Sequence, residues 1–466
     1  MKKTNFLPLL FSCLFLFSFQ VKSQNSMNMT LLSQWKDSSI TGSLLYNNAF
    51  NEVWGYTRNN REYAIIGSSR GTHFFDVTNP SSIVEVDFVQ GRDTGKYIVH
   101  RDYHDYKNYL YMVTDEGNGS LQIVDLTYLP DSVHLVYDDN TKIKLSHNIF
   151  IDTATDKLYS CGGGNAEKFN VFSLANPLSP QRLYRGHIDI SWWATTVGSG
   201  GYVHDVYSRN DTVYCNAGNG LYVVDFSGTT PTLLASLKSY PDGGYNHSGW
   251  LSEDGKTYTL TDETWGKKVK FFDVSNLNSI QFLDTIGSNI TSNSIPHNVI
   301  TKGDYAYVAY YYDGTYIYNI ADPSNPYLTG YYRTSTETNY RSYKGNWGIY
   351  PFLPSGILLA SDMQNGLFVL KVSDATSLAK LDRSKRFKIF PNPFVNNLKL
   401  IGLSNFNEKY SIRLTDINGR EILNKKLENK FLKTEKIDLP ANLPKGIYVV
   451  TIFNSNFTQT KKLIKQ

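Results

Sequence analysis

The chain has 466 residues and a formal net charge of +4, and 14% of its residues are aromatic. This length accommodates one large domain and a second small one, and the high aromatic content favours β-strands. The charge is divided unevenly, because residues 387–466 contain 14 Lys and Arg against 6 Asp and Glu. The rest of the chain is therefore acidic, which argues against nucleic acid as a partner.

The N-terminal residues have the pattern of a secretory signal. Two lysines follow Met1, and an apolar run from Phe6 to Phe19 leads to a small residue at Ser23. This pattern predicts a signal peptide over residues 1–23 that is removed on export. No later stretch is long and apolar enough for a transmembrane helix. We therefore expect an exported mature chain without a transmembrane segment.

Residues 24–373 repeat a pattern of four short strands. The clearest copy is 201–237, where four apolar runs are separated by turns rich in Gly, Asn and Asp. Its third strand recurs every 46 to 52 residues. The seven copies of this strand lie at 72–80, 121–126, 169–177, 221–226, 269–276, 315–323 and 367–374. A period near fifty with four strands per unit is typical of propeller blades. The sequence therefore predicts an all-β fold built on a seven-bladed β-propeller.

The seventh unit lacks its fourth strand, because a polar and charged segment follows Ser373. A matching strand lies at the other end of the chain, where TLLSQWK (30–36) resembles the fourth strand TLLASLK (232–238). We expect the N-terminal strand to complete the last blade, which removes the exposed edges of an open array. Residues 374–386 then form a linker.

The C-terminal tail, residues 387–466, reads as alternating strands joined by Asn-Gly and Lys-Gly turns, which predicts a small β-sandwich. It opens on a Pro-Asn-Pro motif at 391–393, continues with Asp416-x-x-Gly419 and Gly446-Ile447-Tyr448, and closes on a Lys-Leu-Ile-Lys motif. These motifs resemble the type A C-terminal sorting domain of type IX secretion. The resemblance implies a Bacteroidota-type export route, a partner in the type IX machinery, and an extracellular or outer cell-surface location.

The repeated units also resemble a known family. FFDVTNP (74–80) and FFDVSN (271–276) are similar to the LVIVD repeat. Together with SHNIFID (146–152), VHDVY (203–207) and NHSGWLS (246–252), they resemble the choice-of-anchor B family of secreted bacterial proteins. This resemblance implies a propeller and no particular activity.

Histidine recurs at one position of the repeat, the start of the first strand. The residues at this position are Trp54, His100, His147, His204, His247, His297 and Trp347. First strands line the channel of a propeller and start on the face that carries the turns between second and third strands. Two of these turns contain Asp115 and Asp262. We therefore expect the five histidines and these two aspartates to gather at one end of the channel.

Imidazole and carboxylate are the ligands of a divalent transition metal such as zinc, manganese or iron. The histidines and the two aspartates are therefore candidate metal ligands. The alternative interpretation is that duplication spread one structural histidine, which ties each strand to the next by a hydrogen bond.

A second set of candidates lies on the same predicted face. It consists of Trp192, Trp193, Trp265, Glu116, Glu263, Tyr340 and Arg341. Exposed aromatic side chains suit a glycan or a peptide ligand, whereas the paired tryptophans can also cap the edge of a blade.

Two functions remain open. The sequence lacks Gly-x-Ser-x-Gly, His-Glu-x-x-His and P-loop motifs. The favoured hypothesis is a secreted or cell-surface propeller that acts as a non-catalytic binding or scaffold module. The alternative is a metal-dependent hydrolase or lyase with a His/Asp site at the channel mouth.

Overall fold

The structure is a computed structural model. It describes residues 26–163, 168–373, 387–390, 393–402, 410–417, 419–427, 435–440, 442–454 and 457–465. The predicted signal peptide (1–23) and linker (374–386) lie outside the described residues. Strands dominate the described chain, and the all-β prediction is confirmed.

Up to residue 373, the described strands form seven antiparallel sheets, each following the chain order of its strands. The first four sheets contain β3 (Phe50–Arg58), β4 (Arg61–Ser68), β5 (Gly71–Asp76) and β6 (Val84–Gln90); β7 (Arg101–Tyr106), β8 (Tyr109–Thr114), β9 (Leu121–Asp125) and β10 (His134–Asp139); β11 (Asn148–Asp152), β12 (Lys157–Cys161), β13 (Phe169–Ser173) and β14 (Gln181–Arg185); and β15 (Asp205–Arg209), β16 (Thr212–Asn216), β17 (Leu221–Asp225) and β18 (Thr232–Leu237). The other three contain β19 (Asn246–Leu251), β20 (Thr257–Asp262), β21 (Val269–Asp273) and β22 (Gln281–Ile286); β23 (Pro296–Lys302), β24 (Tyr305–Tyr310), β25 (Gly314–Asn319) and β26 (Tyr327–Tyr332); and β27 (Asn346–Tyr350), β28 (Ile357–Asp362) and β29 (Gly366–Val372).

Two N-terminal strands join the last two sheets. The short β1 (Ser26–Met27) pairs with β26, and β2 (Met29–Trp35) pairs antiparallel with β29. Strand β2 thus supplies the fourth strand of the sheet that contains β27, β28 and β29. Its Trp35 packs against Phe50 and Phe75 of the first sheet, with ring centroids 5.3 and 4.7 Å away.

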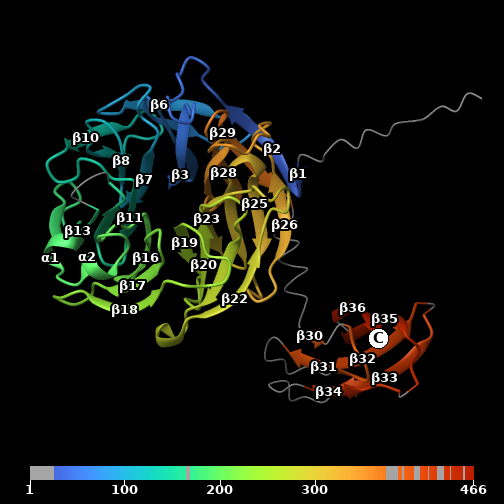
Figure 1. The fold of residues 1–466 in the computed structure, drawn as a ribbon. Coiled ribbons are helices and arrows are strands. Elements are labelled where there is room, and N and C mark those ends of the chain that lie inside the picture. Colours follow the sequence, from blue (N-terminus) through green and yellow to red (C-terminus); the bar gives the residue numbers. More distant parts are fainter. Residues whose placement is uncertain are drawn as a thin grey trace, which may run out of the picture.

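The first strands of successive sheets contact one another in a closed circuit, from β3 through β7, β11, β15, β19, β23 and β27 back to β3. Figure 1 shows the sheets arranged around a common centre, with the labelled first strands nearest to it. Apolar side chains of neighbouring sheets fill the space between them; one such cluster joins Val171 of β13 to Val206 of β15 and Val224 of β17. This arrangement points the start of each first strand toward one axis.

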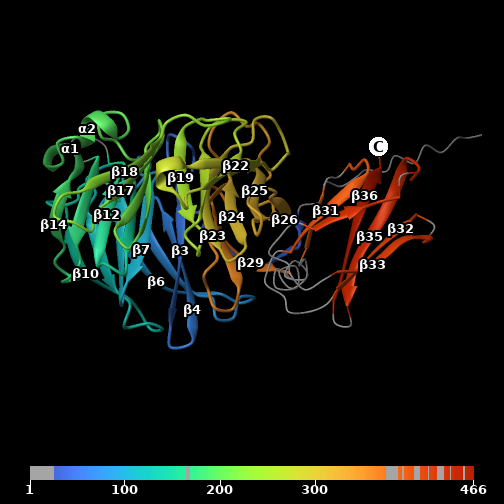
Figure 2. The same ribbon diagram turned by 90° about the horizontal axis from the view of Figure 1, so that it is seen from below.

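The helical segments are short. They are α1 (Gly186–Asp189), α2 (Trp193–Thr196), η1 (Leu277–Ser279) and η2 (Tyr311–Asp313). Helices α1 and α2 belong to the connection between β14 and β15, and Figure 2 shows them on one face of the ring of sheets. No helix in the described part of the chain is long and apolar enough to cross a membrane.

The tail forms two sheets of its own. One contains β30 (Phe387–Phe390), β31 (Asn397–Gly402) and β34 (Glu435–Asp438); the other contains β32 (Tyr410–Asp416), β33 (Glu421–Leu427), β35 (Gly446–Asn454) and β36 (Phe457–Lys465). Both sheets contribute to one buried apolar cluster, with Leu400 from the first and Leu414 and Val450 from the second. The tail therefore has a core made from its own residues.

Candidate functional site

Five imidazoles and one indole form a closed circle on the central axis. Successive ring centroids are 4.6 Å apart for His100 and His147, 4.4 Å for His147 and His204, 4.1 Å for His204 and His247, and 4.6 Å for His247 and His297. Trp347 closes the circle, 4.8 Å from His297 and 5.2 Å from His100. We call these six side chains the histidine ring. The expected gathering of the histidines is thus present.

Irregular strand starts place several of these side chains. In β19, β23 and β27 the register with the next strand shifts at the positions of His247, His297 and Trp347. A bulge of this kind re-aims a side chain that a regular strand would turn to one face of the sheet. A register shift also occurs at the start of β3, between Phe50 and Val53.

Carboxylates approach the ring at two places. Asp115 Oδ2 lies 3.0 Å from His147 Nδ1, and Glu116 is hydrogen-bonded to His100 Nδ1. On the other side, Glu263 lies 3.7 Å from His247 Nε2 and 4.0 Å from His297 Nε2.

Two groups of three therefore bring their ligand atoms within 4.8 Å of one another, namely His100, Asp115 and His147, and His204, His247 and Glu263. Two imidazoles and one carboxylate form a common ligand set for zinc and iron.

Unpartnered nitrogens mark one side of the ring. His247 is only 1% exposed, and neither of its ring nitrogens has a hydrogen-bond partner; Nδ1 of the buried His204 has none either. A buried polar atom without a partner is unfavourable unless a ligand or water satisfies it. His297 differs, since its Nδ1 donates to the carbonyl of Trp347 at 2.6 Å. The strand-tying interpretation describes His297, and the backbone of the next first strand also lies close enough to His204 and His247 to act on their pKa values.

Burial sets the protonation of the ring. It lowers the pKa of His204 and His247 well below the usual value, with a further lowering by the neighbouring imidazoles, and it lowers the pKa of His297 to about 3. At His147 burial also lowers the pKa, but the hydrogen bond and charge of Asp115 outweigh it and the pKa is raised. Burial raises the pKa of Glu263 to about 7. Neutral imidazole is the form that binds metal, and three of the five histidines are held in it near pH 7.

The ring forms the floor of a cavity of about 470 Å³, which we call the cup. Tyrosines and one tryptophan make its wall: Tyr46, Tyr202, Tyr245, Tyr311, Tyr343 and Trp265. Trp265 is 40% exposed and packs against Tyr343, with ring centroids 5.3 Å apart. The cup thus combines a metal-ligating floor with an aromatic rim.

Asp262 is not part of the site, although the sequence analysis placed it there. Its side chain is fully buried, forms an ion pair with Lys270 at 2.8 Å, and accepts a hydrogen bond from Tyr240 at 2.8 Å. Consecutive residues of a strand end point to opposite faces, so Glu263 reaches the ring instead of Asp262. Trp54 is not part of the histidine ring either, because its indole packs against the His104 imidazole, with the two centroids 4.8 Å apart.

The predicted ligand-binding residues divide into three groups. Trp193 is fully buried and stacks on Phe169 at 4.5 Å, and the half-buried Trp192 packs on Trp193, so this pair caps a hydrophobic core. Trp265 lines the cup, whereas Glu116 and Glu263 contact the histidine ring. Tyr340 stacks on Tyr312 and is hydrogen-bonded to Asp313, and Arg341 is exposed; neither lines the cup.

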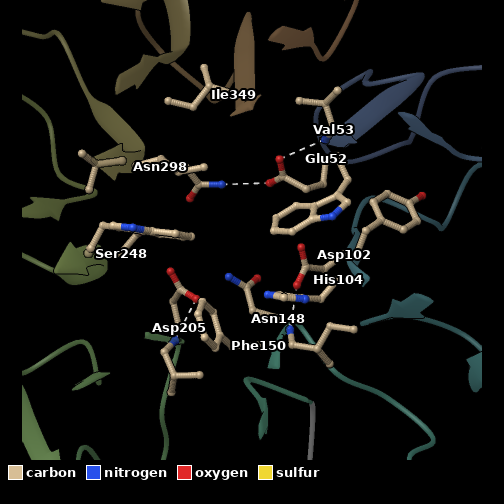
Figure 3. Close-up of a pocket in the computed structure, with 18 residues that line it drawn as sticks. Glu52, Val53, Asp102, His104, Asn148, Phe150, Asp205, Ser248, Asn298 and Ile349 are labelled. Carbon is tan, nitrogen blue, oxygen red and sulfur yellow. Dashed lines mark hydrogen bonds between the residues drawn. The ribbon is translucent and has the colours of Figure 1, made fainter. Parts of the chain in front are cut away.

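A set of polar residues in the first strands was not predicted from the sequence. Glu52, Asp102 and Asp205 point into a second cavity below the ring, as Figure 3 shows. Burial raises the pKa of all three carboxyls, that of Asp102 to about 7. The sequence contained one signal for these residues, since a polar residue directly follows several of the histidines, as in His204-Asp205 and His297-Asn298.

The comparisons bear on both parts of the chain. Residues 388–466 match the family model described as a secretion system C-terminal sorting domain. The tail has the sequence of a sorting domain. This sorting domain implies export by type IX secretion to the cell surface or the extracellular space. Residues 296–334 match the LVIVD repeat. No curated protein matches this chain.

Three solved structures resemble this chain and have low sequence identity to it. PorZ of Porphyromonas gingivalis, an essential surface component of that organism's type IX secretion system, has 10% identity and a TM-score of 0.46; the match covers 92% of this chain and 61% of PorZ. The β-propeller domain of Cps50 (Swd1) from Myceliophteria thermophila has 11% identity and a TM-score of 0.49, with 70% and 97% covered. The periplasmic gluconolactonase PpgL of Pseudomonas aeruginosa has 12% identity and a TM-score of 0.48, with 84% and 99% covered.

Proposed function

We propose that this chain is an exported binding module of the choice-of-anchor B type, which binds a divalent transition metal in its histidine ring. Residues 1–23 serve as the signal peptide, residues 24–373 form the propeller, and residues 387–466 engage the type IX machinery. Residues 374–386 link the propeller to the tail. Export follows the type IX route of Bacteroidota, and the mature protein is extracellular or held at the outer cell surface.

Strand pairing supports this division of the chain. The seven sheets up to residue 373 correspond to seven blades, and the pairing of β2 with β29 corresponds to closure by the N-terminal strand. In the tail, two sheets that share one apolar cluster correspond to the sandwich of a sorting domain. The separate core of the tail suits a unit that acts in export alone.

The observation that carries the metal proposal is the pair of ligand groups in the ring. In each group, two imidazoles and one carboxylate place their ligand atoms within 4.8 Å of one another, so that a small side-chain adjustment brings them onto one ion. The orphaned nitrogens of His247 and His204 add a physical reason for a ligand, because an ion would satisfy them. The aromatic rim of the cup then offers a surface on which a glycan or peptide ligand contacts the bound metal.

A metal-dependent hydrolase or lyase is the second candidate, and Glu263 favours it. Its carboxyl has a pKa raised by burial to about 7, and it accepts a hydrogen bond from the Tyr311 hydroxyl at 2.5 Å. A carboxyl that titrates near neutrality is suited to general acid–base catalysis. In that case the metal lies at His100, Asp115 and His147, and Glu263 acts on a substrate in the cup.

Zinc and manganese binding to the untagged mature chain tests the proposal. We expect isothermal titration to show that the wild type binds the metal. His204→Ala combined with His247→Ala should remove binding at the group that contains Glu263, and His100→Ala combined with His147→Ala should remove binding at the group that contains Asp115. His134→Ala is the matched control, because His134 lies in the exposed strand β10 and stacks on Tyr128. Equal zinc binding by the wild type and by a chain in which these four histidines are all alanine contradicts the proposal.

The same preparations separate the two candidates. The zinc-loaded protein is assayed against chromogenic esters, phosphate esters and glycosides, with Glu263→Gln beside the wild type. If the chain is a binding module, neither the wild type nor Glu263→Gln shows turnover. An enzyme shows turnover that Glu263→Gln abolishes while zinc remains bound at His100, Asp115 and His147.

A further inference from the structure

A second polar cavity lies directly below the histidine ring. We call it the acidic chamber, and its polar lining comes from Glu52, Asp102, Asn148, Asp205, Ser248 and Asn298. In Figure 3 these side chains project from the surrounding first strands toward a common centre. The chamber encloses about 60 Å³, which is room for roughly four water-sized occupants.

The carboxyl groups of the chamber are hydrogen-bonded to backbone and amide groups. Glu52 accepts hydrogen bonds from the backbone of Val53 and from the Asn298 amide, both at 2.9 Å. Asp102 accepts from the backbone of Ile149 at 2.6 Å, and Asp205 from that of Val206 at 2.8 Å.

No lysine or arginine is among the residues that line the chamber. The adjacent Arg101 turns away, because its guanidinium donates to the carbonyls of Ser68 and Asp93. The lining therefore offers these carboxyl groups no lysine or arginine, although the His147 imidazole lies near enough to lower the pKa of Asp102 and Asp205.

Aromatic rings close the chamber on the side away from the histidine ring. Trp54 lies 4.8 Å from His104 and 5.0 Å from Tyr350, and Phe150 lies 5.0 Å from His104 and 5.8 Å from Trp250. Phe352 completes the circle between Trp250 and Tyr350, at 5.9 and 5.5 Å. An apolar floor lowers the local dielectric constant and strengthens the attraction of the carboxylates for a cation.

A side chain outside the acidic cluster also points to a missing occupant. Between ring and chamber lies a narrow space lined by His247 together with Glu52 and Asp102. His247 is 1% exposed and both of its ring nitrogens lack partners. The Asn298 carbonyl oxygen, which faces the same column, also has no partner. These atoms can be satisfied by waters that belong to a bound ion.

We infer that the acidic chamber holds one hydrated divalent cation of the hard, oxygen-preferring class, Mg²⁺ or Ca²⁺. Its lining offers carboxylate, amide and hydroxyl oxygens, which are the ligands of these ions. The chamber carboxylates are not among the described groups of three whose ligand atoms lie within 4.8 Å of one another. The ion therefore keeps part of its water shell and contacts the more distant carboxylates through water.

The position of this ion gives it a structural role. Glu52, Asp102 and Asp205 come from β3, β7 and β15, which belong to three different sheets. A cation between them links these sheets across the axis. Glycine at position 348 leaves the required space, because a Cβ there would lie 1.8 Å from Glu52 Oε1. The oxygen ligands of the chamber are separate from the residues proposed to hold a metal in the histidine ring, although His247 borders both.

Terbium luminescence tests the inference, since Tb³⁺ replaces Ca²⁺ at oxygen sites and is excited by nearby tryptophan. Trp54 and Trp250 line the chamber. We expect the EDTA-treated full chain to bind Tb³⁺ with sensitised emission, and Ca²⁺ or Mg²⁺ to displace it, which shows which ion the chamber prefers. Addition of the preferred ion should also raise the melting temperature.

Glu52→Gln combined with Asp205→Asn should weaken Tb³⁺ binding by at least about tenfold, because two charged oxygen ligands are lost. His204→Ala combined with His247→Ala reports whether Tb³⁺ lies in the histidine ring instead, and Asp131→Asn, an exposed control, should leave binding within about twofold. Emission that persists in the chamber variant, or that disappears only in the ring variant, overturns the inference. The wild-type titration requires no variant to fold, and absence of both emission and a shift in melting temperature overturns it as well.

Discussion

Replacement of Asp262 by alanine tests whether this residue is a structural partner of Lys270 or a metal ligand. Both side chains are 0% exposed, and Lys270 Nζ lies 2.8 Å from Asp262 Oδ2. Without Asp262, the ammonium retains only the Lys268 carbonyl at 3.0 Å and the more distant Asp242 at 3.8 Å. Removal of one partner from a buried pair costs about 3–5 kcal/mol. We expect about 3 kcal/mol, the lower limit, because these two contacts remain.

The assay is urea unfolding of the wild type, Asp262→Ala, and Asp262→Ala combined with Lys270→Met, each with and without zinc. The single variant should lose about 3 kcal/mol of unfolding free energy in both conditions, and the double variant should regain most of it because no buried charge remains unpaired. A loss below about 1 kcal/mol, or a loss seen only with zinc, refutes this reasoning.

Two further outcomes follow from the packing. Trp35→Ala in β2 should cost about 3 kcal/mol in urea unfolding, since its ring packs on Phe50, His73 and Phe75; an effect below about 1 kcal/mol contradicts closure by β2. Burial raises the pKa of Asp362 to about 6 from 3.8. Its protonated form therefore stabilises the fold below pH 4, and about 3 kcal/mol is lost as the pH rises through 6. Asp362→Asn should reduce this pH-dependent loss of unfolding free energy. An unfolding free energy with the same pH dependence as in the wild type contradicts the prediction.

The repeat made the gathering of the histidines predictable. Residues at one position of a repeated unit occupy equivalent places around the axis, so His100, His147, His204, His247 and His297 meet without any knowledge of distances. The N-terminal strand was predictable for the same reason, because its sequence resembles a fourth strand and it pairs with β29.

The remaining parts depend on local geometry that the repeat does not encode. Strand alternation at the end of β20 decides that Glu263 and not Asp262 faces the ring. In β3 the register shift falls at Asn51 and Glu52, the positions that correspond to His297 and Asn298 of β23, so Trp54 lies farther along its strand and below the ring. Trp193 is buried because the connection between β14 and β15 folds into two short helices that pack it on Phe169.

Anomalous diffraction from a zinc-soaked crystal of the untagged protein tests the central claim most directly. The account predicts an anomalous peak inside the histidine ring, within about 2.0–2.3 Å of ligand atoms from His204, His247 and Glu263 or from His100, Asp115 and His147. Absence of a peak at the ring, with the imidazoles bonded instead to the backbone of the next strand as His297 is bonded to Trp347, would contradict it.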